Sequence, residues 1–337
     1  FWIVNPNNTV RRNAAAGGTH FGYWYRLPLN PTGPSATPLV CPRSIPLGEF
    51  SNNSAHSFGW YGLWVFPRYH PQVGGGCGGN NPQPVYFDNL LSWHNNQGAE
   101  FTEVGALQLR NSVLLDNNLA GLTVVHVETQ WGSQSAALQG TLIVGQSAIT
   151  ANCTLTGIRT PESYFFTVSN VTFVNFGTPD CVPIRACSHC KENDGGFETR
   201  FEGIKFVNCT QVSQWQWPHE HLHRDMDGSL TGIRGSSLIP THALLPRTCF
   251  NHNGTIGVVP GSVCPAGIQF GRFAVHSPSP SSLTFMAAAM LNQEGGNITL
   301  PFAKERIAPI NGYMALLPLN ATYQFQWPLS TYITNIS

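Results

Sequence analysis

The 337-residue sequence has little charge: only 10% of its residues are charged, against roughly 25% in a typical soluble protein. Acidic and basic residues balance at 17 each, and only three of the basic residues are lysines. Such a chain lacks the basic surface that nucleic-acid binding requires. It also lacks the basic clusters that hold a protein on an anionic membrane. We therefore expect neither partner.

Long apolar runs are also missing: there is no stretch of about 18 apolar residues, so we expect no membrane span in this chain. Glycine (34) and proline (25) are too frequent for a helical protein. Disorder is excluded because 42% of the residues are hydrophobic and 11% are aromatic, which is enough for a core. This composition is typical of an extracellular all-β protein.

What the sequence does contain is an excess of Asn-x-Ser/Thr motifs, spread from end to end. They predict covalent N-glycans and passage through the secretory pathway. The alternative is an Asn-rich protein with incidental motifs. The nine asparagines are Asn7, Asn52, Asn152, Asn170, Asn208, Asn253, Asn297, Asn320 and Asn335.

Nine cysteines fit an oxidising compartment, and their odd number leaves at least one free or paired outside the chain. The first residue is Phe, and no signal peptide is visible. We expect the chain to be a mature form or part of a longer one.

A weak internal repeat organises the first two thirds of the chain. Asn89 matches Asn111 at an offset of 22, and Gly98 matches Gly121 at an offset of 23. Each unit contains an Asn, a short β stretch, an Asn pair and a Gly followed by alternating apolar residues. Similar units occur at 50–65, 168–176 and 201–209. A period near 22 predicts a parallel β-helix, whose coils share one interior and whose corners suit Asn and Gly. A β-sandwich is the alternative.

Long segments interrupt this pattern and read as loops outside the coils. They cover 28–46, rich in proline, 73–84, rich in glycine, and 178–196, with three cysteines. We expect a β-helix with such insertions over 1–265, and a C-terminal cap or partial β domain over 266–337.

Several motifs resemble the fibrocystin and cell-surface hyaluronidase family, in the family's order. They lie at 5–25, 31–34, 45–50, 53–57 and 225–232. The resemblance covers most of 1–265. It implies a right-handed parallel β-helix, downstream of a G8 domain, from a large extracellular or membrane-anchored glycoprotein. Some family members depolymerise hyaluronan. The residue sequence of 227–232 is more similar to the fibrocystin branch than to the hyaluronidases, which lowers the expectation of enzyme activity.

The densest polar cluster is the segment 218–228. On a strand, alternate side chains share one face, so three imidazoles and two carboxylates would lie together. They suit Zn²⁺ through the imidazoles, Ca²⁺ through the carboxylates, or acid–base catalysis on a glycan. The structural alternative, which we favour, is an outward polar face at a corner, with Asp side chains accepting from turn amides. The candidates are His219, His221, His223, Asp225 and Asp227.

The resemblance suggests a catalytic or binding role for His56. The structural alternative is a corner histidine that contacts neighbouring coils. Hydrolysis of a glycoside by the usual route needs two carboxylates roughly 5–10 Å apart. Glu49, Asp88, Asp116 and Asp227 are candidates, and the sequence does not pair them.

The Cys187-x-x-Cys190 spacing suits zinc or redox chemistry in a reducing compartment. Because the glycosylation motifs argue against such a compartment, we expect structural disulfides in a local cluster with Cys181. The family also shows a cysteine pair near Cys249 and Cys264, which implies a disulfide there. Cys153 and Cys209 either join adjacent coils or stay buried.

Trp215 and Trp217 are candidates for stacking on sugar rings, since aromatic faces pack on apolar sugar faces. Trp60 and Trp64 fit better as core or as cover beneath a loop.

The leading hypothesis is an N-glycosylated structural, adhesive or receptor-like segment of a fibrocystin-like protein at a cell or ciliary surface. Its partners would be glycans or other extracellular proteins. Its open ends also suggest head-to-tail assembly into a fibre. The alternatives are a polysaccharide-degrading enzyme and a non-catalytic carbohydrate-binding module. No cofactor is required, with Ca²⁺ or Zn²⁺ as lesser possibilities.

Overall fold

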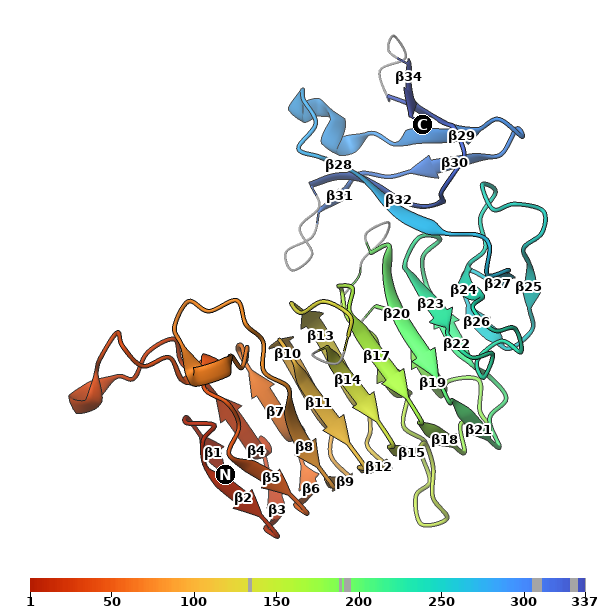
Figure 1. The fold of residues 1–337 in the computed structure, drawn as a ribbon. Coiled ribbons are helices and arrows are strands. Elements are labelled where there is room, and N and C mark those ends of the chain that lie inside the picture. The colour runs from red at the N-terminus through yellow and green to blue at the C-terminus, as the bar shows by residue number, and fades with distance from the viewer. Residues whose placement is uncertain (133–134, 188–189, 191–194, 305–310, 328–332, 337) are drawn as a thin grey trace.

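The computed structural model describes residues 1–132, 135–187, 190, 195–304, 311–327 and 333–336. Over these residues the chain is all-β, and its helical elements are short 3₁₀ turns. Three long sheets run side by side along a solenoid, and a smaller β unit follows beyond its far end (Figure 1). The prediction of a parallel β-helix is confirmed.

Most coils contribute one strand to each of the three sheets. Along the chain, a strand of the first sheet is followed by one of the second sheet and then by one of the third. The first sheet contains β1 (Trp2–Ile3), β4 (Phe21–Arg26), β7 (Tyr61–Phe66), β10 (Gln97–Val104), β13 (Ala120–Val127), β16 (Thr156–Arg159), β19 (Val182–Arg185), β22 (Ser213–Trp215) and β26 (Thr255–Gly257). The second contains β2 (Thr9–Arg11), β5 (Glu49–Ser51), β8 (Val85–Asp88), β11 (Leu107–Arg110), β14 (Ala136–Gln139), β17 (Phe166–Ser169), β20 (Phe197–Glu202), β23 (His221–Asp225), β24 (Ser237–Pro240), β27 (Gly261–Cys264) and β25 (Phe250–His252). The third contains β3 (Ala14–Gly18), β6 (Ser54–Phe58), β9 (Leu91–Trp93), β12 (Val113–Leu115), β15 (Leu142–Val144), β18 (Thr172–Val174) and β21 (Lys205–Val207).

The register reproduces the repeat seen in the sequence. Phe87 of β8 lies beside Leu109 of β11, and Gln97 of β10 lies beside Ala120 of β13. These pairs are 22 and 23 residues apart, as the Asn and Gly offsets predict. The insertions lengthen some coils, but the strands return to the same position in each sheet.

One corner of each coil, between the second and third sheets, has a left-handed backbone. Asn52, Asn89, Asn111 and Asn170 have φ between 51° and 53°, and Gly203 takes the same corner with φ 62°. Asn tolerates this conformation because its short side chain bonds locally, and Gly tolerates it because it lacks a Cβ. The recurring Asn and Gly of the sequence therefore mark corners.

The corner before the first sheet is held by a ladder of asparagine side chains. The Oδ1 of Asn95 accepts from the backbone N of Phe58 at 3.0 Å, and the Oδ1 of Asn117 accepts from the backbone N of Asn95 at 3.0 Å. Glycines follow at the start of these strands. A Cβ at Gly98 would lie 2.5 Å from the carbonyl oxygen of Gly121 in the next coil. The coils approach so closely here that only glycine fits.

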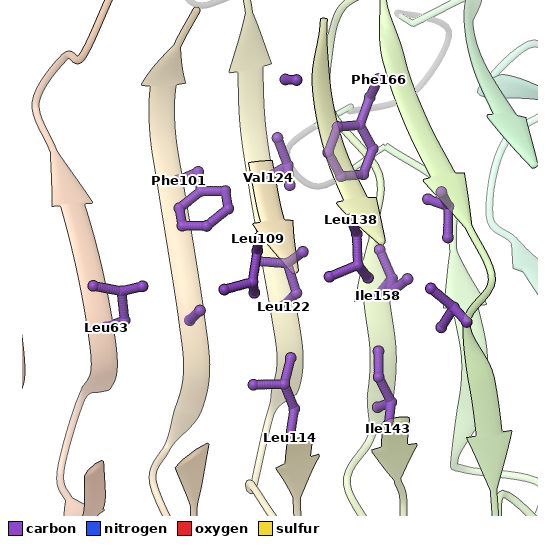
Figure 2. Packing of buried hydrophobic residues seen from close by; sticks show 14 of the residues in the cluster. Leu63, Phe101, Leu109, Leu114, Leu122, Val124, Leu138, Ile143, Ile158 and Phe166 are labelled. Carbon is purple, nitrogen blue, oxygen red and sulfur yellow. The ribbon is translucent and has the colours of Figure 1, made fainter. Parts of the chain in front are cut away.

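The interior of the solenoid is a continuous apolar stack. Figure 2 shows side chains from all three sheets pointing into it, among them Leu109, Leu122 and Leu138. Each is fully buried. Burying one such side chain contributes roughly 1.5–3 kcal/mol, so stacking the coils provides most of the driving force.

The first two insertions form loops outside this stack. They contain the 3₁₀ turns η1 (Gly33–Ser35), η2 (Pro42–Ser44) and η3 (Val73–Gly75). A disulfide between Cys41 and Cys77 joins the two loops. The expectation of a loop over 178–196 is wrong in part, because Val182–Arg185 forms β19 of the first sheet and Ile184 is buried in the core.

Beyond β23 the second sheet continues in antiparallel order through β24, β27 and β25. A separate unit with its own apolar cluster follows. It contains η4 (Ser281–Phe285) and two antiparallel sheets. One has β28 (Phe270–His276), β32 (Asn311–Pro318) and β31 (Ala303–Lys304), and the other has β30 (Asn297–Leu300), β29 (Ala288–Asn292), β33 (Tyr323–Gln326) and β34 (Ile333–Ile336).

Candidate functional site

The polar segment 218–228 forms the strand β23 and the turn after it. His221 and His223 lie on one side of this strand, with ring centroids 5.6 Å apart, and both are fully buried. The expectation of an outward polar face is therefore wrong for these two histidines. The interior of the last coils accepts them because each ring finds a partner there.

Each of the two rings has one hydroxyl partner. The Nε2 of His221 lies 2.9 Å from Oγ1 of Thr199, and the Nε2 of His223 lies 2.9 Å from Oγ of Ser213. Burial lowers the pKa of His221 to about 3 and that of His223 well below its usual value. Both rings are neutral at physiological pH and lack contact with solvent, so they behave as core residues.

His219 lies apart from this pair. Its ring packs on the ring of His242, with centroids 4.6 Å apart. Its Nδ1 accepts a hydrogen bond from the backbone N of Leu316 in β32 at 3.3 Å. Within the described ranges, no three metal-ligating side chains of 218–228 converge. The three imidazoles therefore do not form a metal site, because they face different neighbours.

The two aspartates of the segment shape the turn that follows β23. The Asp225 carboxylate is fully buried and accepts from the backbone N of Gly228 at 2.9 Å and of Thr231 at 2.7 Å. Asp227 accepts from the backbone N of Gly203 at 2.7 Å and from Oγ of Ser229 at 2.6 Å. These contacts are those of aspartates that satisfy turn amides, and they use the oxygens that a metal or substrate would need.

His56 lies on the third sheet and contacts the next coil. Its ring stacks on Trp93 of β9 at 4.2 Å, and its Nδ1 lies 3.0 Å from Oγ of Ser57. This geometry is that of a corner histidine that joins neighbouring coils.

The other candidate carboxylates each have a local partner. Asp88 accepts from the Nε of Arg110 at 2.9 Å, and Asp116 accepts from the backbone N of Ser147 at 2.7 Å. Glu49 accepts from Oγ of Ser51 at 2.7 Å. These contacts occupy each carboxylate with a neighbour of its own coil or of the next one.

The expected stacking role of Trp215 is wrong. Trp215 is fully buried and packs on His223 at 4.6 Å, while Trp217 is half-buried. A group of stacked aromatic side chains lies instead on the first sheet. Trp2, Trp24 and Trp64 occupy the same position on three neighbouring strands. The ring centroids of Trp2 and Trp24 lie 4.9 Å apart, and those of Trp24 and Trp64 lie 5.5 Å apart. The Trp at one shared position of successive units is the sequence signal for this ladder.

The glycosylation asparagines lie on the surface. Asn7, Asn52, Asn152, Asn170, Asn208, Asn253, Asn297 and Asn320 are all exposed, and the side chain of Asn335 lies outside the described part. Asn52, Asn170 and Asn208 occupy left-handed corners, which hold their side chains away from the interior.

Eight of the nine cysteines form four disulfides. They are Cys41–Cys77, Cys153–Cys181, Cys187–Cys190 and Cys249–Cys264. Cys181 therefore bonds outside the local cluster in which we expected it, because the loop after β15 brings Cys153 beside it. Cys209 is the unpaired cysteine among the described residues, and its half-buried Sγ lies 3.6 Å from the carbonyl oxygen of Phe173.

Comparison with known proteins agrees with this architecture. A family model described as the CEMIP beta-helix matches residues 1–63. Mouse fibrocystin-L is 39% identical over the whole of this chain, and dog fibrocystin is 28% identical over 97% of it. The chain is a fibrocystin-like β-helix segment. Human cell surface hyaluronidase CEMIP2 is 32% identical over 36% of the chain. The expected resemblance is thus confirmed.

This fibrocystin-like chain spans only 8% of the length of the fibrocystin-L and fibrocystin proteins that it matches. A search of the described residues finds no helix long and apolar enough to cross a membrane.

Proposed function

We propose that the chain is an extracellular, N-glycosylated structural and adhesive segment of a fibrocystin-like cell-surface protein, and that it is not an enzyme. The observation that carries this proposal is the burial and bonding of the side chains that could take part in catalysis. His221, His223 and Asp225 are fully buried and bonded within the fold, and His56 is stacked on Trp93. The three buried side chains are not presented to a substrate, and the partly exposed His56 ring is used to join two coils.

The glycosylation motifs and disulfides support the extracellular part of the proposal. Exposed asparagines at corners can accept glycans without disturbing the stack of coils. Four disulfides form and persist in an oxidising compartment. Together they favour a secreted or cell-surface setting, whereas a ciliary location stays a prediction.

The test is to express the chain with a secretory leader in animal cells. We expect it in the medium, with a mass that falls after enzymatic removal of N-glycans and with glycopeptides at Asn52 and Asn170. The secreted protein is then incubated with size-defined hyaluronan. Unoccupied asparagines would refute glycosylation, and shortening of the polymer that survives repurification would refute the non-enzymatic role.

A carbohydrate-binding role is the second candidate. It is supported by the exposed Trp60, which lies 4.7 Å from His20, and by an adjacent hollow of about 390 Å³ lined by His20, Phe21 and Trp24. In the Trp ladder the ring faces stack on one another, so Trp60 is the better sugar contact. Trp60→Ala should abolish signals on a glycan array, whereas Phe285→Ala, an exposed aromatic on η4, should keep them. An array silent with the native chain would remove this candidate.

Head-to-tail fibre assembly stays a prediction. The second sheet ends in the antiparallel strands β24, β27 and β25, whereas the first sheet stays parallel up to β26, so the two sheets would offer different edges to another copy.

A further inference from the structure

A cluster of charged and imidazole side chains lies at one edge of the first sheet, away from 218–228. Glu103 lies near the end of β10, and its cross-strand neighbour on β13 is His126. Glu128 follows β13. The segment after β7 returns to this edge because Tyr69 forms a parallel bridge with Val104. That bridge places Arg68 and His70 beside the two glutamates.

The donor atoms of this cluster are close together. The Nδ1 of His70 lies 3.0 Å from Oε2 of Glu128, and one donor atom each from His70, Glu103 and Glu128 lie within 4.8 Å of one another. The Nε of Arg68 lies 3.1 Å from Oε1 of Glu103, and its guanidinium also contacts Glu128. Arg68 thus fills the space between the two carboxylates, where a cation is required.

Arg68 does not satisfy this cluster completely. The Nδ1 of His70 lies 3.2 Å from the Nε of Arg68 as well as 3.0 Å from Glu128, and it cannot accept from one and donate to the other at once. The Nε2 of His70 and the Nδ1 of His126 are buried without a hydrogen-bond partner. Two carboxylates and the His70 imidazole therefore converge around one guanidinium, which leaves a conflict at the Nδ1 of His70.

The two carboxylates lie close to each other, because Glu103 and Glu128 both contact the Arg68 guanidinium. A divalent cation would neutralise both carboxylates at the same place.

We propose that His70, Glu103 and Glu128 bind a divalent transition-metal ion of the Zn²⁺ class, in competition with Arg68. Imidazole nitrogen and carboxylate oxygen together suit Zn²⁺, Co²⁺ or Ni²⁺, whereas Ca²⁺ prefers oxygen ligands alone. The Arg68 side chain is one-third exposed and has room to turn towards solvent when the ion enters. Water completes the coordination. This site is distinct from 218–228, whose imidazoles do not converge.

The experiment uses the full chain, produced without a histidine tag and stripped with a chelator. Zn²⁺ is titrated by calorimetry, and Co²⁺ is titrated while its visible absorption is recorded, because the intensity of that band reports the coordination number. We expect one ion per chain and a four- or five-coordinate Co²⁺ spectrum. His70→Ala and Glu128→Gln should abolish both signals.

The competing arginine provides the more specific test. Arg68→Gln removes the resident cation and should tighten Zn²⁺ binding by about tenfold, corresponding to about 1.4 kcal/mol. His56→Ala, a histidine on the third sheet, is the matched control and should bind like the native chain. Circular dichroism checks that each variant is folded.

Two results would overturn the proposal. One is the absence of binding in both the native chain and Arg68→Gln. The other is stoichiometric binding that His70→Ala and Glu128→Gln leave intact. Neither result depends on whether the chain is glycosylated or adhesive, so the outcome is separable from the proposed function.

Discussion

Lowering the pH from 7 to 5 is expected to destabilise the chain through its buried histidines. The ring of His221 has a pKa of about 3 and that of His219 a pKa of about 4 in the folded chain, against 6.5 for an exposed histidine. Burial causes both shifts, since the interior disfavours the charged imidazolium. Below pH 6.5 the unfolded chain therefore binds protons that the folded chain does not.

This difference sets the sign and the size of the effect. The stabilisation is fully present above pH 6.5 and is lost as the pH falls towards the folded pKa of each ring. At pH 5 each of these two rings should cost about 2 kcal/mol of unfolding free energy, or about 4 kcal/mol together. That is a large fraction of the roughly 5–15 kcal/mol typical of a folded domain. The pKa values of Glu103 and Glu220 are raised to about 7, so these two carboxyl groups add stability as the pH falls over the same range, and the histidine contribution is measured as a difference between variants.

The assay is urea unfolding at pH 7 and pH 5, followed by tryptophan fluorescence. His221→Gln keeps a polar group near Thr199 but cannot titrate, so it should lose about 2 kcal/mol less than the native chain between the two pH values. Thr199→Val is the control, because it removes the hydroxyl partner and keeps the imidazole. It should lower stability at both pH values. An identical pH dependence in the native chain and in His221→Gln would refute the reasoning.

Three further substitutions and one control substitution test the stacking of the coils. Gly98→Ala should lower the midpoint of thermal unfolding, because its Cβ would lie 2.5 Å from the carbonyl oxygen of Gly121, whereas Gly76→Ala meets no atom within 4 Å and should leave it unchanged. Equal midpoints for these two variants would contradict the close approach. Asn95→Ala should cost about 1–3 kcal/mol in urea unfolding, since it leaves a buried backbone donor unpaired. Leu109→Ala should cost about 2–5 kcal/mol in the same assay because it opens a cavity in the stack, and a loss below 1 kcal/mol would mean that the coils collapse around it.

Much of the fold could be predicted because its signals are local and repeated. The 22- and 23-residue offsets that begin at Asn89 and Gly98 are the number of residues in one coil. Asn89 is favoured by its left-handed corner, and Gly98 is required by the close approach of the next coil. The insertions at 28–46 and 73–84 were visible because they are rich in proline and glycine. The segment 178–196 was not correctly assigned, because its middle part, Val182–Arg185, is a strand of the first sheet.

The candidate site was predicted less well. Alternation along 219–223 correctly placed His221 and His223 on one side of a strand, but strand periodicity does not say which side faces the interior. The inward side was decided by Thr199 and Ser213, which reach the two rings from neighbouring strands. The pairing of Cys181 with Cys153 likewise depends on a loop path that cysteine spacing does not encode.

The sequence by itself determined the class of protein: a sparsely charged chain rich in Asn and Gly, with a repeat that requires a parallel β-helix. Only the tertiary structure decided which polar residues meet. Glu103 and Glu128 lie about one coil apart on neighbouring strands, but nothing in the repeat places His70 beside them. The three residues come together because parallel coils align residues that are far apart in sequence, and because a bridge at Tyr69 returns one loop to the edge of the sheet.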